Sequence, residues 1–193
     1  MSAAVTHLLY LHGFRSSPQS AKARTMAAWL AAHRPAVVWH CPQLPPSPRA
    51  AMDGVFAVVD CWPAETMAVV GSSLGGFYAT AVAERTGCRA VLLNPAVDPA
   101  RDLRRHIGEI TAWHSDEGFF FRSEYIDELR QLAVPVTKPQ RYGAVIAKGD
   151  EVLSWEEMAQ HYAGIRMKLL EGSDHGLSDF AEHLPGIVEF LGL

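Results

Sequence analysis

The chain has 193 residues and a net charge of −4, with 49% hydrophobic and 20% charged residues. This composition is ordinary for a globular protein, and the small negative charge argues against binding to nucleic acid or to an anionic membrane surface. Its three cysteines (Cys41, Cys61 and Cys88) are too few and too scattered for a disulfide framework. We therefore expect one domain over residues 1–193, with neither a nucleic-acid nor a membrane partner.

The N-terminal residues 1–6 have no basic region and no signal-peptide architecture. The apolar run that follows is far too short to span a bilayer. We expect a cytoplasmic protein. An oligomer is possible, but nothing in the sequence indicates one.

The N-terminal part predicts a strand, a helix and a second strand. Val5–Leu11 is a near-continuous apolar run, typical of a strand covered on both faces, and it ends at His12-Gly13-Phe14. A helix should follow, with Ser17 as its cap and Pro18 at its first position. The second expected strand, 36–41, leads into a proline-rich loop and another helix.

Residues 66–79 read as a short apolar strand, a sharp turn and a helix, with a serine at the turn. Gly71, Ser73 and Gly75 fit the Gly-x-Ser-x-Gly nucleophile elbow, in which a strained turn lifts the serine hydroxyl above a sheet. The glycines have a steric reason, because strand and helix backbones nearly touch at such a turn. The alternative without a catalytic role is an ordinary glycine-rich turn between a strand and a helix. A phosphate-binding loop is disfavoured, because neither of its glycine signatures is present.

A fourth strand, 89–93, ends at Asn94, and the strand–helix alternation then lapses over residues 98–140. Short helices are expected from Asp98 and from Ser123, with an aromatic segment between them. This stretch is interpreted as an inserted cap or pocket wall. A surface excursion packed on the sheet edge is the alternative.

Alternation resumes with strands 142–147 and 165–170, followed by a C-terminal helix. Six strands alternating with helices predict a doubly wound, mostly parallel sheet with right-handed crossovers. The carboxyl ends of all six strands then lie along one edge, where such sheets carry their sites. Ser73, Asp150 and His175 each fall at a strand end, so the sequence predicts that they meet there.

These three residue types suit nucleophilic catalysis. A serine hydroxyl needs a base to take its proton, and His175 lies in a glycine-flanked loop directly after the last strand. A carboxylate must hold the base, and the order Ser73, Asp150, His175 matches that of α/β-hydrolases. Glu151 and Asp174 remain competing acids.

An oxyanion requires two fixed N–H donors. The expected donors are the backbone N–H groups of Leu74, directly after the serine, and Phe14, in the loop after the first strand. Gly13 would let that loop approach closely, and His12 would make a structural hydrogen bond. No metal or cofactor is implied, because no ligand spacing such as His-Glu-x-x-His or Cys-x-x-Cys occurs.

The sequence resembles the YqiA-like esterases, a short branch of the α/β-hydrolase superfamily, over nearly its whole length. The segments that carry the resemblance are Leu9-Tyr10-Leu11-His12-Gly13-Phe14, Ser16-Ser17-Pro18, Ser20-Ala21-Lys22-Ala23, Pro42-Gln43-Leu44-Pro45-Pro46, Gly71-Ser72-Ser73-Leu74-Gly75-Gly76, Asn94-Pro95-Ala96-Val97 and Gly149-Asp150-Glu151-Val152-Leu153. The fit is loosest over 98–140 and around Asp174 and Leu177.

The resemblance implies a three-layer α/β-hydrolase fold of short form, with about six mostly parallel strands and helices on both faces. It also implies a cofactor-free serine esterase or thioesterase acting on short acyl esters or acyl-CoA thioesters, with Ser73, Asp150 and His175 as its triad. Apart from the resemblance, we expect the small-molecule substrate to lie against supporting and pocket residues that include Leu44, Asn94 and Phe120, with pocket walls from 119–121 and Tyr125.

The primary expectation is a serine carboxylesterase that hydrolyses short to medium acyl esters through an acyl-enzyme. An acyl-CoA thioesterase is the first alternative. A catalytically inactive binding protein on the same fold is the second, and the complete set of three residues argues against it.

Overall fold

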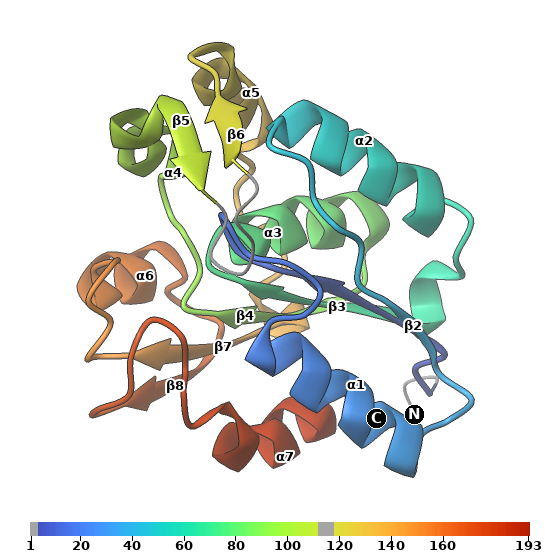
Figure 1. The fold of residues 1–193 in the computed structure, drawn as a ribbon. Helices are drawn as coiled ribbons and strands as arrows, with labels where there is room; N and C mark the ends of the chain where they lie inside the picture. The colour runs from blue at the N-terminus through green and yellow to red at the C-terminus, as the bar shows by residue number, and fades with distance from the viewer. Residues whose placement is uncertain (1–3, 112–117) are drawn as a thin grey trace.

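The computed structural model describes residues 4–111 and 118–193. Within these residues the main sheet has six strands, all parallel to their neighbours, in the order β2-β1-β3-β4-β7-β8 (Figure 1). The strands are β1 (His7–Leu11), β2 (Val38–His40), β3 (Met67–Ser72), β4 (Arg89–Leu93), β7 (Tyr142–Ala147) and β8 (Arg166–Leu170). The predicted doubly wound parallel sheet is confirmed, and its strand order reverses between β1 and β3.

Helices cover both faces of this sheet. The α-helices are α1 (Ala21–His33), α2 (Pro48–Val59), α3 (Leu74–Thr86), α4 (Pro99–Asp102), α5 (Glu124–Leu132), α6 (Trp155–His161) and α7 (Phe180–Leu191), and short 3₁₀ turns are η1 (Ala64–Thr66), η2 (Leu103–His106) and η3 (Pro139–Arg141). Figure 1 shows α1 and α7 on one face and α2 and α3 on the other. No helix among the described residues combines the length and apolarity needed to cross a membrane.

The two faces of the sheet carry separate cores because successive side chains of a strand point to opposite sides. In β1, Leu9 and Leu11 join the core under α2 and α3, whereas Leu8 and Tyr10 join the core under α1 and α7. All four side chains are fully buried. The apolar run of this strand therefore reflects burial on both faces, as the sequence predicted.

The start of α1 differs from the prediction. The helix begins at Ala21, and Ser20 is its N-cap, with its hydroxyl accepting a hydrogen bond from the Ala23 N–H. Ser17 instead accepts a hydrogen bond from the Gln19 N–H within a preceding turn. The later start places Lys22 in the first turn of α1.

The 98–140 stretch contains an unpredicted hairpin besides its helices. Strands β5 (Gly108–Thr111) and β6 (Gly118–Phe121) pair antiparallel in a second small sheet. Residues 112–117, which include part of the predicted aromatic segment, lie outside the described residues. α5 packs beside α2 and α4, so the inserted stretch stands over the α2–α3 side of the main sheet (Figure 1).

Candidate active site

Ser73 occupies the sharp turn between β3 and α3, in a strained backbone conformation with φ 56° and ψ −120°. A positive φ is uncommon for a residue other than glycine, and it persists only where the surroundings enforce it. Here the Ser73 N–H donates to the Leu93 carbonyl at 2.9 Å, and the Ser73 carbonyl accepts from the Ala96 N–H at 3.0 Å. The backbone of β4 and the turn after it therefore hold the serine in place.

Two glycines allow the close approaches that this turn requires. A Cβ atom on Gly71 would lie 2.1 Å from the carbonyl oxygen of Gly75, at the start of α3. A Cβ atom on Gly75 would lie 2.0 Å from the carbonyl oxygen of Leu11, at the end of β1. The helix thus presses on β3 at one glycine and on β1 at the other, and both positions exclude a side chain.

The structure brings Ser73, His175 and Asp150 into one hydrogen-bonded chain. The Nε2 atom of His175 lies 3.0 Å from the Ser73 Oγ, and its Nδ1 atom lies 2.7 Å from the Asp150 Oδ2. Because a carboxylate can only accept, Nδ1 donates to Asp150, and Nε2 is left to accept from the serine hydroxyl. The geometry is that of a hydroxyl nucleophile with an oriented base.

The Asp150 carboxylate is fully buried and its second oxygen is also satisfied. Oδ1 accepts hydrogen bonds from the N–H groups of Val152 and Leu153, both at 2.8 Å. An aspartate that bonds its own following backbone in this way fixes a turn. The carboxylate is therefore held rigidly toward His175.

The competing acids have other partners. Glu151 accepts from the backbone N–H of His175 at 3.0 Å, and it makes no recorded bond to the ring. Asp174 accepts from the Ser178 N–H at 3.0 Å. Of the acids weighed from the sequence, Asp150 is the one that contacts the imidazole.

Asn94, expected as a supporting residue, ties three chain segments together. It is buried at the end of β4 with a positive φ of 42°. Its amide nitrogen donates to the carbonyls of Asp174 and His175, at 3.0 and 3.1 Å, and its amide oxygen accepts from the Ala147 N–H at 2.8 Å. The loop carrying His175 is thereby anchored to β4 and β7.

Lys22 is a site residue that the sequence did not reveal. Its ammonium group donates to the carbonyl of Gly176, directly after His175. Burial lowers the pKa of Lys22, and the nearby carboxylates of Asp174 and Asp150 act against that shift. No spacing or motif pairs the first turn of α1 with this loop, so only the fold reveals the contact.

The loop after β1 lies against the serine. A Cβ atom on Gly13 would lie 3.2 Å from the Ser73 Cβ, which is a tight contact. Within the described residues, no acceptor is recorded for the backbone N–H of Phe14 or of Leu74. The two predicted oxyanion donors are therefore both available beside Ser73.

His12 supports this loop as a neutral, buried side chain. Its Nδ1 lies 2.9 Å from the Gly13 carbonyl, and its Nε2 lies 3.1 Å from the Leu44 nitrogen. Since the carbonyl accepts and the Leu44 N–H donates, the proton is on Nδ1. Burial lowers the pKa of His12, with the Gly13 carbonyl acting against that shift. His12 thus links the loop after β1 to the proline-rich loop.

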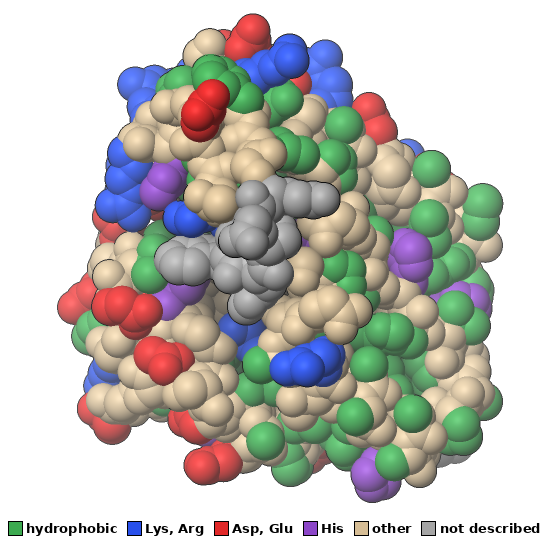
Figure 2. Space-filling model, in the orientation of Figure 1, with side chains coloured by type: hydrophobic (Ala, Val, Ile, Leu, Met, Phe, Trp, Pro, Cys, Tyr) green, Lys and Arg blue, Asp and Glu red, His purple; other side chains and the backbone are tan. Residues whose placement is uncertain are grey.

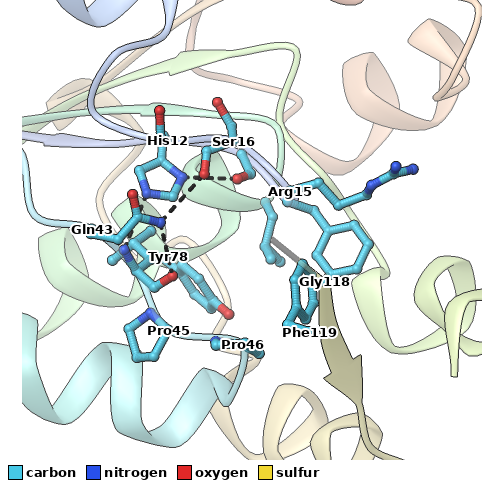
Figure 3. Close-up of a pocket in the computed structure, with 14 residues that line it drawn as sticks. His12, Arg15, Ser16, Gln43, Pro45, Pro46, Tyr78, Gly118 and Phe119 are labelled. Carbon is cyan, nitrogen blue, oxygen red and sulfur yellow. Dashed lines mark hydrogen bonds between the residues drawn. The ribbon is translucent and has the colours of Figure 1, made fainter. Parts of the chain in front are cut away.

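Two cavities adjoin the Gly13–Phe14 loop. The first, which we call the serine cavity, has a volume of about 500 Å³ and is lined by Ser73 and His175. The second, the Tyr78 cavity, has about 430 Å³ and is lined by Tyr78 and Leu44 (Figure 3). Both are lined by Gly13, Phe14 and Leu74, so they meet at the candidate oxyanion donors.

Phe120, expected in the pocket, lies elsewhere. Its side chain is 55% exposed and lines neither cavity, whereas Phe119 lines the Tyr78 cavity and Phe121 is buried. Alternation along β6 puts Phe119 and Phe121 on one face and Phe120 on the other. Because the sequence analysis did not recognise a strand in this segment, it could not tell which of the three rings faces the cavity.

Basic side chains gather near the serine cavity. Lys and Arg cluster over α4 and β5 on the face shown in Figure 2. Lys22 and Arg105 line the cavity itself, together with the acids Asp102 and Glu151. Among residues 4–111 and 118–193, no group of three or more His, Cys, Asp or Glu side chains is arranged to hold a metal ion.

The parallel sheet, its covering helices and the serine turn define an α/β-hydrolase fold. Residues 7–192 match the family described as "Uncharacterised protein family (UPF0227)", and the chain belongs to that family. This is the family of the YqiA-like proteins, so the predicted resemblance is confirmed.

Solved structures share the fold at low sequence identity. A protein from Agrobacterium vitis S4 has a TM-score of 0.76 and 16% identity, covering 99% of this chain and 91% of its own. Alpha/beta hydrolase domain-containing protein 10 from mouse has a TM-score of 0.72 and 15% sequence identity, and the match covers 99% of this chain and 92% of the mouse chain. Est1E from Butyrivibrio proteoclasticus, with ferulic acid bound, has a TM-score of 0.71 and 17% sequence identity, and the match covers 96% of this chain and 87% of the Est1E chain. These similarities establish the fold.

Proposed function

We propose that this protein is a serine carboxylesterase that hydrolyses short to medium acyl esters through an acyl-enzyme. The observation that carries the proposal is the hydrogen-bonded chain from Ser73 Oγ through His175 to the buried carboxylate of Asp150. The two unpartnered N–H groups beside Ser73 support it, and so does the kinship with α/β-hydrolase folds. The ferulic acid in Est1E is itself a carboxylic acid, which accords with a carboxylic ester as substrate.

In the first half-reaction, Ser73 Oγ attacks the ester carbonyl carbon while its proton passes to His175 Nε2. The Phe14 and Leu74 N–H groups stabilise the oxyanion, and Asp150 stabilises the imidazolium. The bond from carbon to the leaving oxygen then breaks, and His175 returns the proton to that oxygen. In the second half-reaction, water attacks the acyl carbon and gives a proton to His175. The bond from that carbon to Ser73 Oγ then breaks, and His175 returns the proton to Ser73 Oγ as the acid leaves.

The test is hydrolysis of a chain-length series of p-nitrophenyl esters, with labelling of Ser73 by a fluorophosphonate. We expect Ser73→Ala to lower kcat by up to about 10⁶-fold, the loss seen for the subtilisin serine. Asp150→Asn should lower it by about 10⁴-fold, because the imidazole would lose its orientation and tautomer. Retention of more than a tenth of wild-type turnover by Ser73→Ala would exclude the mechanism. Absence of labelling in a folded protein would favour the inactive binding protein.

An acyl-CoA thioesterase is the second candidate, favoured by the lysine and arginine that line the serine cavity. Coenzyme A carries phosphates that such cations would attract. Matched acyl-CoA and p-nitrophenyl substrates of equal chain length decide between the two. A higher kcat/KM on the CoA series, abolished in Ser73→Ala, would replace the ester with a thioester.

A further inference from the structure

The serine cavity and the Tyr78 cavity lie on either side of the predicted oxyanion donors, Phe14 and Leu74. During acylation, the leaving oxygen must receive a proton from His175 Nε2, so the departing alcohol has to lie in the cavity that His175 lines. The Tyr78 cavity is lined by neither Ser73 nor His175, but it opens at Gly13, Phe14 and Leu74, where the carbonyl oxygen would sit. It is therefore placed to take the acyl group.

We propose that the Tyr78 cavity is the acyl subsite and that it favours acyl groups bearing a hydroxyl or carbonyl oxygen on a compact apolar body. The inference rests on the proposed function, which supplies the acyl transfer. It goes further by assigning one cavity to one part of the substrate and by naming the side chain that selects it.

Tyr78 supplies the polar contact. Its side chain is 2% exposed, and no hydrogen-bond partner for its hydroxyl is recorded among the described residues. Figure 3 shows the hydroxyl pointing into the space between Pro46 and Phe119. The hydroxyl faces the cavity and can donate a hydrogen bond to a partner there. A substrate oxygen in this cavity would be that partner.

Tyr78 is also correctly spaced from the reacting group. It lies five residues beyond Ser73 on α3, about one and a half helical turns, so one rigid element carries both. Burial, with the Glu128 carboxylate nearby, raises the pKa of Tyr78, so the phenol stays protonated and can donate. The selecting group is thus fixed relative to the nucleophile.

One part of the cavity wall is apolar, and another part is lined by polar residues, namely His12, Arg15, Ser16, Ser17 and Gln43. Phe119 packs edge-on against Phe14 with ring centroids 6.0 Å apart, and Leu44, Pro45 and Pro46 line the cavity from the proline-rich loop. A volume of about 430 Å³ lies near the low end of the range for small-molecule sites. The cavity therefore suits a short or single-ring acyl group whose polar atom faces Tyr78.

The experiment compares two substrates with the same leaving group, p-nitrophenyl 3-phenylpropanoate and p-nitrophenyl 3-(4-hydroxyphenyl)propanoate. The wild-type protein should prefer the hydroxylated ester in kcat/KM by about tenfold, the order of one good hydrogen bond. Tyr78→Phe keeps the ring and removes the hydroxyl, and it should abolish this preference by lowering kcat/KM on the hydroxylated ester toward the value on the plain ester. Equal preference in wild type and Tyr78→Phe would overturn the assignment of Tyr78.

A second pair of variants tests the wall. Phe119→Ala should extend activity toward longer acyl chains, whereas Phe120→Ala, one residue away but exposed, should leave the chain-length profile unchanged. The same variants are assayed on acetate esters of increasingly large alcohols. If Phe119→Ala changes the alcohol profile instead of the acyl profile, the cavity holds the leaving group and the proposal is wrong.

Failure of the inference can be distinguished from failure of the proposed function. If the wild-type protein is folded but neither hydrolyses any ester nor reacts with a fluorophosphonate, the proposed function fails. If it is active and Ser73-dependent, but Tyr78→Phe and Phe119→Ala behave like wild type, only the subsite assignment fails.

Discussion

The turn that carries Ser73 and the loop that carries His175 meet at one point, but different forces hold them. The turn is fixed by backbone contacts, with Gly71 and Gly75 allowing main chains to touch. The His175 loop has one such contact, at Gly149, whose added Cβ would lie 2.3 Å from the Ser173 carbonyl oxygen. The other contacts that hold this loop are made by side chains from segments far away in the sequence.

Those side chains are Asn94 from the end of β4, Glu151 from the end of β7 and Lys22 from α1. The contacts at Gly71 and Gly75 tolerate no side chain, because the main chains of the buried strands and of α3 cannot move aside there. Side-chain tethers act in parallel, so loss of one loosens the loop without removing it. We therefore expect substitutions at the Ser73 turn to lower the stability of the fold. Substitutions at the side chains that hold the His175 loop should instead lower activity, because they displace the imidazole.

The largest predicted effect is a difference in stability between alanine substitutions at Gly75 and Gly149, whose added Cβ atoms would each clash with a backbone carbonyl oxygen. Gly75→Ala places a methyl group between α3 and β1, both deep in the core, and we expect it to destabilise the fold by about 3 kcal/mol or more. Gly149→Ala lies in an exposed loop that can shift, so stability should fall by only about 1 kcal/mol while esterase activity falls sharply. Urea unfolding with parallel kinetics measures both. Equal losses of stability would contradict the comparison.

Asn94→Ala should come next. It leaves the buried N–H of Ala147 without an acceptor, which costs about 1–3 kcal/mol, and it releases the Asp174 and His175 carbonyls. Activity should fall more than stability requires. Asn94→Asp is the control, because it keeps an acceptor for Ala147 but turns a carboxylate toward the two carbonyls. If Asn94→Asp restores full activity, the amide donor does not anchor the loop.

Lys22→Met should have a smaller effect. Losing the ammonium contact to the Gly176 carbonyl should lower kcat several-fold, with a change in stability of about 1 kcal/mol or less, since the other tethers remain. Lys22→Arg keeps the charge and a donor, and it should recover part of the activity. An unchanged kcat in Lys22→Met would show that this tether is dispensable.

The smallest effect concerns pH and the loop after β1. Burial lowers the pKa of His12, so below the unfolded value of about 6.5 the unfolded chain binds a proton that the folded chain does not. Stability should therefore fall as pH drops through 6.5, by at most about 1.4 kcal/mol per pH unit for one such histidine. His12→Gln keeps an acceptor for Leu44 and should flatten the slope. The substitution should not abolish the slope of stability against pH, because burial also lowers the pKa values of His40, His106 and His161. A steeper slope in His12→Gln would contradict the assignment.

Much of the architecture could be predicted from the sequence because its causes are local. Strand periodicity and continuous apolar runs gave the six strands of the main sheet within the described residues, and glycine spacing gave the turn at Ser73. The rule that parallel strands end at one edge placed Ser73, Asp150 and His175 together. The order of these residues along the chain sufficed to pair them.

The rest depends on contacts between segments far apart in the sequence. Asp150, rather than Glu151, contacts the imidazole because its Oδ1 accepts hydrogen bonds from the Val152 and Leu153 N–H groups, which orient the carboxylate. The Glu151 carboxylate instead accepts from the His175 N–H. Lys22 reaches Gly176 because α1 packs on the same face of the sheet as α7, the helix that follows the His175 loop. The register of β6 on β5 decides which of the rings of 119–121 faces the cavity. A shift of the pairing by one residue would exchange the two faces of β6. The sequence by itself determined the fold and the set of proposed reacting groups, because both follow from local patterns and strand ends. The tertiary structure decided which neighbours hold these groups and which side chains line the cavities beside them, because those contacts join segments far apart in the chain.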